Sequence, residues 1–187
     1  GRALAGGGRY LLAVGTVEPR KDLPTLVRAF DRLAGRDGDL RLVIAGPDGW
    51  GADALTAAIG DAARGDRVVR LGWVDEEQRA ALLAGATAYA FPSVYEGFGL
   101  PAVEAMSAGV PVVTTRAGSL PEVCRDGADL VAVGDVDALA AALHRVVDDA
   151  GHRADLIERG RKVAAGYDWD VTAERFAALL GQFHQLP

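Results

Sequence analysis

The sequence predicts an α/β fold, namely a doubly wound, Rossmann-like parallel sheet of about six strands with helices on both faces. Short apolar runs alternate with amphipathic helical patterns along most of the chain. The runs are rich in Val, Leu, Ile and Ala, as is typical of parallel strands that are covered on both faces. A chain of 187 residues is long enough for one domain with a packed core.

The order of the elements follows from these runs and from the turn residues between them. The expected strands cover residues 10–14, 40–45, 68–71, 87–91, 110–114 and 130–133. The expected helices cover residues 23–34, 52 to about 63, 76 to about 84, and 100–108. Two more are expected to start at residues 120 and 136. The tail, 149–186, is expected to form two helices that separate near residues 166–168. In the first helix, Leu23, Leu26, Val27 and Phe30 keep the spacing of one apolar face.

Polar residues mark the starts of several of these helices. The helix from residue 100 carries Pro101 in its first turn and Gly109 just past its end, which is the expected asymmetry. We predict side-chain caps at four helix starts: Asp22, Asp75 with Gln78, Ser119 with Glu122, and Asp135.

The composition excludes several classes of function. The 26 acidic residues outnumber the 20 basic ones, and a net charge of −6 argues against a nucleic-acid partner. Cys124 is the single cysteine, so the chain has no internal disulfide and suits a reducing compartment such as the cytoplasm. No apolar run reaches the roughly 18 residues of a membrane span.

The fold class also tells where a ligand should bind. Doubly wound parallel sheets bind ligands outside the carboxyl ends of their strands. The loops at that edge are expected at residues 15–22, 46–51, 72–75, 92–99 and 115–119. We therefore expect the functional residues there.

The most informative motif is Glu-Gly-Phe-Gly-Leu-Pro-x-x-Glu-Ala at residues 96–105. Gly97 and Gly99 allow close approach to a ligand, and the helix that follows directs free N–H groups and a positive dipole end at the loop. This arrangement is suited to bind a phosphate. Glu104 is placed to accept hydrogen bonds from the hydroxyl groups of a ribose, and Glu96 to accept them from hydroxyl groups on the other side of the phosphates. The alternative is that Glu104 only complements the helix dipole and Glu96 is a solvated loop acid.

Arg20 and Lys21 form a second motif, at the end of the first strand. Two adjacent cations at the ligand edge of an acidic chain indicate an anionic partner, because arginine can hold phosphate oxygens in pairs and lysine acts as a mobile charge. The alternative is a solvated turn, although cations at a helix start oppose the helix dipole.

These motifs together resemble the donor-binding, C-terminal half of GT-B-fold, family-4-type retaining glycosyltransferases. The likeness is carried by residues 15–21, 96–105, 108–113 and 118–122, and it runs from about residue 10 to 183. Many members carry Gly-Arg where this chain has Gly15-Thr16, so the phosphate-binding arginine would be Arg20, as in members that read Pro-Arg-Lys.

The resemblance implies a role for each site residue. Glu104 would hold the ribose hydroxyls and Glu96 those of the donor sugar, while Arg20 and Lys21 would bind the diphosphate and stabilise its departure. Glu96, Arg20 and Lys21 are thus the expected catalytic residues. The expected donor-binding residues are Gly15, Trp73 and Val74 near the base, Phe98, Gly99 and Leu100 through their backbone, and Glu104.

The reaction implied is transfer of a sugar from a nucleoside diphosphate sugar to an acceptor with retention of configuration. The Pro-Arg-Lys variant favours GDP-mannose, and neither a metal nor another cofactor is expected. A carbohydrate or lipid-linked acceptor would bind mainly to a missing N-terminal domain, without which the chain is expected to be inactive. The enzyme would be cytoplasmic, and contact of the whole protein with the inner membrane face stays open.

The domain expectation covers the whole chain, 1–187, as one donor-binding domain. Residues 1–8 contain no Met and are rich in glycine, so they are expected to be an interdomain linker remnant. Residues 167–187 are expected to form a terminal helix that reaches back to the absent domain.

Several rival interpretations of the motifs are weaker. Gly97, Gly99 and Ala102 also fit a dinucleotide-binding fingerprint, but the acidic residue expected after the next strand is replaced by Thr-Thr-Arg, which leaves only an NADP-dependent enzyme. A sensor that binds a nucleotide sugar without catalysis is a third class. The Asp-x-Asp at 135–137 is interpreted as a helix cap, and the histidines at 144, 152 and 184 lack the spacing of a metal site.

Trp50 and Cys124 are two further residues with possible roles in the site. Trp50 lies on the glycine-rich loop 46–51, where it either contacts a ligand or anchors the loop. Cys124 has no histidine nearby in sequence, so a packing role is favoured over a nucleophilic one.

Overall fold

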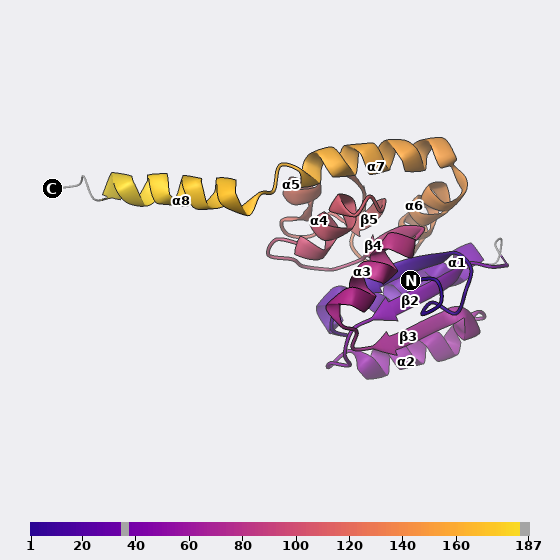
Figure 1. The fold of residues 1–187 in the computed structure, drawn as a ribbon. Helices are drawn as coiled ribbons and strands as arrows, with labels where there is room; N and C mark the ends of the chain where they lie inside the picture. Colours follow the sequence, from indigo (N-terminus) through magenta and orange to yellow (C-terminus); the bar gives the residue numbers. More distant parts are fainter. Residues whose placement is uncertain (35–37, 184–187) are drawn as a thin grey trace.

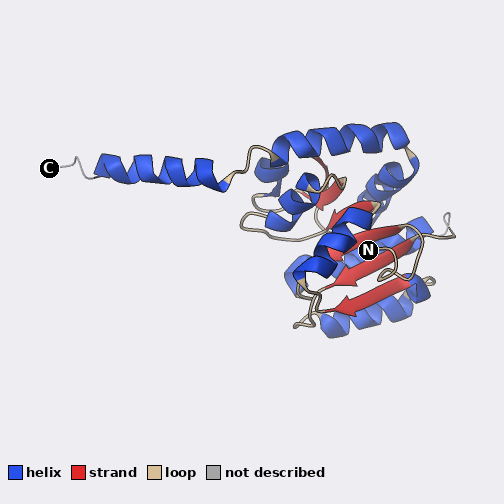
Figure 2. Ribbon diagram, viewed as in Figure 1, coloured by secondary structure: helices blue, strands red, loops and turns tan. Residues whose placement is uncertain are grey.

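A computed structural model describes residues 1–34 and 38–183, and within this part of the chain six parallel strands form one sheet (Figures 1 and 2). The strand order is β3-β2-β1-β4-β5-β6, so the order reverses between β1 and β4. The strands are β1 (Tyr10–Val14), β2 (Arg41–Ala45), β3 (Val68–Gly72), β4 (Ala88–Phe91), β5 (Val112–Thr115) and β6 (Ala128–Val131). The predicted Rossmann-like sheet is confirmed.

Helices cover both faces of the sheet because successive strand side chains point to opposite sides. In β1, Leu11 packs into one buried cluster and Leu12 into the other. The first cluster lies under α1 (Leu23–Ala34), α2 (Ala52–Asp61) and α6 (Val136–Asp148). The second lies under α3 (Glu76–Gly85), α4 (Leu100–Ser107) and α5 (Leu120–Cys124), while α7 (Ala150–Ala164) contributes to both.

Two of the four predicted side-chain caps are confirmed, and the other two, at Ser119 and Asp22, do not form as predicted. Asp75 and Gln78 form the expected capping box, and Asp135 accepts a hydrogen bond from the backbone N–H of Ala138. Ser119 makes no cap hydrogen bond, because its hydroxyl donates instead to the carbonyl of Glu96. The side chain of Ser119 therefore serves the loop before α4 rather than its own helix.

Asp22 also departs from the expectation of a side-chain cap. Asp22 has a left-handed backbone conformation, with φ at 44°. Its backbone carbonyl accepts hydrogen bonds from the N–H groups of Thr25 and Leu26. The turn η1 (Pro19–Lys21) ends at Asp22, so this conformation redirects the chain from η1 into α1. Aspartate is one of the few residues that tolerate it.

Some element boundaries differ from the predicted ones. β5 starts at Val112 rather than at residue 110, because Val110 still bonds back to Ala105 at the end of α4. β6 covers Ala128–Val131 rather than 130–133, because pairing with β5 places Ala128 opposite Val112.

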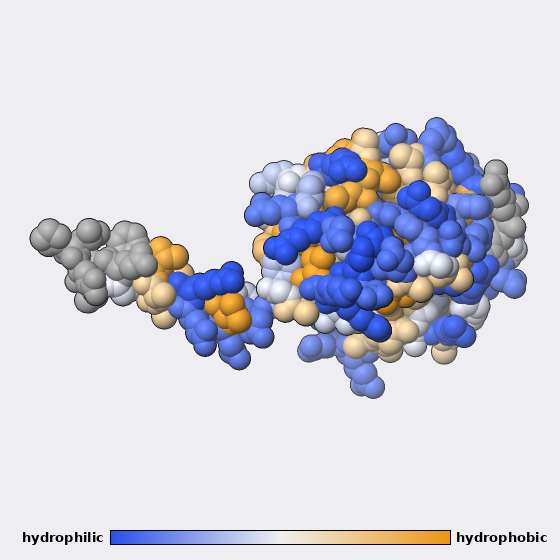
Figure 3. Space-filling view, turned by 90° about the horizontal axis from the view of Figure 1, so that it is seen from above, coloured by the Kyte–Doolittle hydropathy of each residue, from blue (hydrophilic) through white to orange (hydrophobic). Residues whose placement is uncertain are grey.

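The last helix, α8 (Trp169–Phe183), projects away from the rest of the molecule (Figure 1). Trp169 is 79% exposed and Phe176 is 64% exposed, and Figure 3 shows apolar side chains along the projecting helix. The expectation that residues 167–187 reach another domain stays a prediction, as does that of a linker at residues 1–8. Among the described residues, no helix is long and apolar enough to cross a membrane.

Candidate functional site

The candidate site lies at the carboxyl ends of β1 and β4, where the strand order reverses. The loop after β1 contains Arg20 and Lys21, and the loop after β4 contains Glu96. A backbone hydrogen bond of 2.8 Å from the Val94 N–H to the Arg20 carbonyl joins the two loops. The fold thus brings the two motifs together at the switch point of the sheet, on the edge where the sequence predicted the functional residues.

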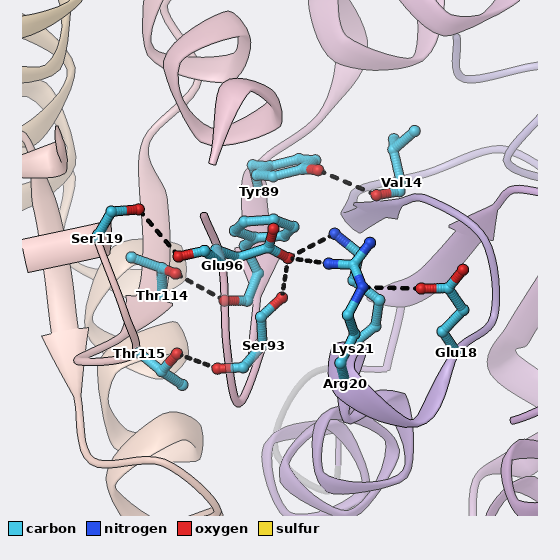
Figure 4. A network of polar contacts seen from close by, with 11 residues as sticks. Val14, Glu18, Arg20, Lys21, Tyr89, Ser93, Glu96, Thr114, Thr115 and Ser119 are labelled. Atoms are coloured by element: carbon cyan, nitrogen blue, oxygen red, sulfur yellow. Dashed lines mark hydrogen bonds and ion pairs between the residues drawn. The ribbon is translucent and has the colours of Figure 1, made fainter. Parts of the chain in front are cut away.

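One carboxylate oxygen of Glu96 is the centre of a polar cluster (Figure 4). Its Oε1 accepts hydrogen bonds from Lys21 Nζ at 2.6 Å, Ser93 Oγ at 2.8 Å and Arg20 Nη1 at 2.9 Å. Arg20 Nε in turn donates to Glu18 Oε2 at 2.8 Å. Glu96 is buried, so it is not the solvated loop acid of the alternative interpretation.

Lys21 is a buried cation that needs both of its neighbours. Only 8% of the residue is exposed, and its ammonium lies 4.4 Å from the centre of the Phe91 ring. The negative face of that ring and the Glu96 carboxylate offset the loss of hydration. Gly15 beside it has φ at +142°, a conformation that favours glycine, and a Cβ there would lie in ordinary contact with Lys21 Cε at 3.4 Å.

The loop that carries Glu96 is fixed to the strand and turn beside it. The Glu96 carbonyl accepts the Ser119 N–H at 3.2 Å and the Ser119 hydroxyl at 3.1 Å, and Thr115 Oγ1 donates to the Ser93 carbonyl. A Cβ on Gly118 would lie 2.4 Å from the Glu96 carbonyl oxygen, so the two backbones are in direct contact. These contacts hold the backbone of the loop at Ser93 and Glu96 in place.

The start of α4 follows directly on the loop that carries Glu96. Gly99 precedes the helix with φ at +95°, and no described side chain caps the first turn. A Cβ at Gly99 would lie 2.5 Å from Leu120 Cδ2, so the position also lacks space for a side chain. Pro101 has no N–H and the Ala102 N–H donates to the Gly99 carbonyl at 2.9 Å, so the first turn offers an anion the Leu100 N–H and the positive end of the helix dipole.

Glu104, eight residues after Glu96, lies in a different environment. Its side chain is 42% exposed, and its Oε2 pairs with Arg79 Nη1 from α3. Tyr89 is buried near both carboxylates, and burial raises the pKa of its hydroxyl, with Glu104 and Glu96 adding to the increase and Arg79 opposing it. Tyr89 therefore remains a neutral hydrogen-bond donor, and it donates to the Val14 carbonyl.

The remaining predicted site residues lie at the same edge, with fewer contacts. Trp73, on the loop after β3, is 72% exposed, and Val74 packs against the second core cluster. The Phe98 ring stacks edge-on against Tyr167, with ring centres 5.4 Å apart, and Leu100 is exposed at the start of α4. No described contact joins these residues to the Glu96 cluster.

Sequence reasoning missed several residues of the site. Ser93 lies three residues before Glu96, and a hydroxyl so close to a buried acid is a detectable signal. Glu18, two residues before Arg20, carries a similar local signal. Ser119 and Arg79 gave none, because their partners are 23 and 25 residues away in directions that only the fold defines.

No described contact joins a histidine or Trp50 to the Glu96 cluster. In the described part of the chain, no three His, Cys, Asp or Glu side chains gather as a metal site. His144 pairs with Asp148 and His152 with Asp129, while His184 lies outside the described residues. Trp50 is 93% exposed, so it does not anchor its loop.

Cys124 is buried, and burial raises the pKa of its thiol to about 11. At neutral pH the group is an uncharged thiol, and only the thiolate is a good nucleophile. The expected packing role is therefore the consistent one.

The sheet topology and the cation cluster at its switch point define a Rossmann-like domain suited to hold an anionic ligand. Residues 2–163 match the family described as Glycosyl transferases group 1, and the chain belongs to that family. The resemblance to GT-B glycosyltransferases is thereby confirmed.

Two relatives illustrate the similarity in sequence. The O-antigen chain mannosyltransferase B of Escherichia coli is 37% identical over 163 residues, which cover 86% of this chain and 42% of that protein. The MMP alpha-(1→4)-mannosyltransferase of Mycolicibacterium hassiacum is 38% identical over 175 residues, which cover 90% of this chain and 42% of that protein. The chain thus spans less than half the length of these relatives.

Two solved structures also match this chain over about half of their own length. The sucrose-phosphate synthase of Thermosynechococcus elongatus matches with a TM-score of 0.83 and 29% identity, over 95% of this chain and 46% of that one. Anabaena HepE matches with a TM-score of 0.85 and 22% identity, over 95% of this chain and 50% of that one, which shows the shared fold.

Proposed function

We propose that this chain is the donor-binding domain of a retaining glycosyltransferase and that it binds a nucleoside diphosphate sugar. The observation that carries the proposal is the Glu96 cluster, in which Arg20 and Lys21 converge on one carboxylate oxygen at a ligand-binding edge. Membership of the glycosyltransferase family and the mannosyltransferase relatives support the same assignment.

Arg20 and Lys21 are the proposed diphosphate ligands. Arg20 is 45% exposed in its side chain, so phosphate oxygens can reach its guanidinium while Glu18 holds its Nε. A diphosphate would compete with Glu96 for the same N–H groups, because all of them converge on Glu96 Oε1. As the cations turn towards the diphosphate, Glu96 becomes free to accept hydroxyl groups of the donor sugar.

The nucleotide half of the donor is proposed to lie along the start of α4. Glu104 would accept the ribose hydroxyls, and the backbone at Phe98, Gly99 and Leu100 would face the phosphates or the sugar. The base would lie near Trp73 and Val74 on the loop after β3. Gly15 and Gly99 keep side chains out of this path.

Catalysis would rest on electrostatic stabilisation of the departing diphosphate. Arg20 and Lys21 are already gathered in a partly buried site, so their charge stabilises the negative charge that develops on the leaving group, a contribution of about 3 kcal/mol in comparable sites. The incoming hydroxyl would attack from the face that the diphosphate leaves, which retains configuration. We propose that neither a metal nor another cofactor is used.

The mannosyltransferase relatives favour GDP-mannose as the donor. The acceptor would be a carbohydrate or a lipid-linked sugar, bound mainly by a second domain that α8 helps to hold. The exposed apolar face of α8 supports such a contact. The reaction would take place in the cytoplasm, with the acceptor at the inner face of the membrane if it is lipid-linked.

A calorimetric panel tests this proposal. We expect this chain to bind at least one of GDP-mannose, UDP-glucose and ADP-glucose at millimolar concentrations or below, and more tightly than NADP. Lys21→Met should weaken that binding by about tenfold, as expected for loss of a charged contact to phosphate. Lys162→Met is the matched control, because Lys162 forms only an exposed pair with Glu158 on α7. Absence of binding to all three sugar nucleotides, or preferential binding of NADP, would contradict the proposal.

A further inference from the structure

Arg79 is a charged residue of the site that neither of the two sequence motifs contains. It projects from α3, and its Nη1 donates to Glu104 Oε2 on α4. The two helices belong to different strand–helix units, so the pair joins the loop region after β3 to the start of α4.

The position of Arg79 is well defined at its backbone. The capping box of Asp75 and Gln78 fixes the start of α3, and the Arg79 N–H donates to the Asp75 carbonyl at 2.9 Å. The arginine therefore starts from a rigid first turn next to Trp73 and Val74. Its side chain is 34% exposed, and its only described side-chain partner is Glu104.

The pair is poorly suited to a purely structural role. Both side chains are partly exposed, and ion pairs of this kind contribute about 0–1 kcal/mol to stability. Glu104 is the fifth residue of α4 and lies beyond its first turn, so the helix dipole does little for its charge. Stability alone does not explain why a cation from another helix is directed at this carboxylate.

The geometry instead suits a carboxylate that must accept a pair of hydroxyl groups. Arg79 contacts Oε2, which leaves Oε1 without a described partner. A carboxylate held at one oxygen loses less side-chain freedom when a ligand binds to it. The other N–H groups of Arg79 remain available to support the same orientation from the α3 side.

We propose that Arg79 is a positioning residue for the nucleotide: it orients Glu104 so that its carboxylate accepts the 2′ and 3′ hydroxyls of the donor ribose. This inference rests on the proposed function, which gives Glu104 the ribose. It extends the site by one residue and makes ribose recognition depend on a contact between α3 and α4.

The test measures how tightly the wild-type protein and its variants bind a nucleotide with and without the two ribose hydroxyls. Among GDP, UDP and ADP, the nucleotide that the chain binds most tightly is compared with its 2′,3′-dideoxy form. We expect Arg79→Gln to weaken binding of the ribonucleotide by about tenfold, which corresponds to a weakened hydrogen bond to a charged group. Binding of the dideoxy nucleotide should change less than about twofold, because it has no diol for Glu104 to hold. Arg79→Lys should restore part of the loss.

Arg32→Gln is the matched control, because Arg32 forms an exposed pair with Asp137 on the α1–α6 side of the molecule. It should leave both affinities unchanged, and melting temperatures show that each variant is folded. Equal weakening of both nucleotides by Arg79→Gln would mean direct contact with the phosphates or the base and would overturn the inference. An unchanged preference for ribose in Arg79→Gln would overturn it as well.

The same experiment separates this inference from the proposed function. A wild-type chain that binds none of the three nucleotides overturns both. A wild-type chain that prefers the ribonucleotide, with a preference that survives Arg79→Gln, overturns only the role of Arg79.

Discussion

The two glutamates of the site lie eight residues apart and differ in almost every physical respect. Glu96 is buried and accepts three hydrogen bonds at a single oxygen, two of them from cations. Glu104 is 42% exposed and has one described partner, Arg79. A ligand must therefore displace an existing network at Glu96, whereas at Glu104 it finds an oxygen already free.

This difference predicts that the two glutamates of one motif contribute differently to the stability of the fold. Removal of the Glu96 carboxylate leaves the buried Lys21 without its counter-charge, so the fold itself depends on Glu96. Removal of the Glu104 carboxylate exposes no buried charge. The account therefore predicts large stability effects at one end of the site and small ones at the other.

The largest effect is expected for Glu96→Ala. It should lower the free energy of unfolding by about 3 kcal/mol, because one partner of a buried ion pair is lost while the other stays buried. Urea denaturation measures this loss. The double variant Glu96→Ala with Lys21→Met should be more stable than the sum of the single changes by about 1 kcal/mol or more, because it removes both charges.

The matched control for this prediction is Glu18→Ala. Like Glu96, Glu18 pairs with Arg20, but the side chain of Glu18 is 33% exposed. Its loss should be below about 1 kcal/mol. Equal destabilisation by Glu18→Ala and Glu96→Ala would remove the distinction between buried and exposed carboxylates.

The next effect concerns the backbone that supports Glu96. Gly118→Ala should destabilise the protein by about 2 kcal/mol, because its φ of 52° is unfavourable for alanine and a Cβ would lie 2.4 Å from the Glu96 carbonyl oxygen. Gly97→Ala is the control, since a Cβ there meets no atom within 4 Å. Thermal melting of the two variants compares them, and an alanine that is tolerated equally well at both positions would show that the loop is not held as described.

The smallest effect is expected for Glu104→Ala. Its free energy of unfolding should change by less than about 1 kcal/mol, as for other exposed ion pairs, and the change should shrink further in high salt. Urea denaturation at low and high salt measures it. A loss as large as that of Glu96→Ala would mean that the Arg79–Glu104 pair is a structural element of the fold.

The two glutamates also show how far the sequence could go. Alternating apolar runs predicted the six-stranded sheet, and the rule for doubly wound sheets placed Arg20, Lys21 and Glu96 at one edge. The direct contact of both cations with Glu96 could not be predicted, because it depends on how two loops 75 residues apart fold over Phe91.

The wrong predictions have the same physical origin. Ser119 carries a correct capping-box signature, yet its hydroxyl binds the Glu96 carbonyl, which is a tertiary partner that the local pattern does not contain. The shifted start of β6 reflects pairing with β5, and strand pairing is likewise set by the sheet. Local sequence patterns failed to predict the structure where tertiary hydrogen bonds or strand pairing determine it.

The central claim is that the two glutamates divide the donor between them, and one crossed binding experiment tests it most directly. Calorimetry would compare the free nucleoside diphosphate with its sugar nucleotide for Glu104→Ala and Glu96→Gln, under conditions in which both variants are folded. We predict that Glu104→Ala weakens both ligands equally, whereas Glu96→Gln weakens the sugar nucleotide and does not weaken the free diphosphate. Equal losses for both ligands in Glu96→Gln would contradict it.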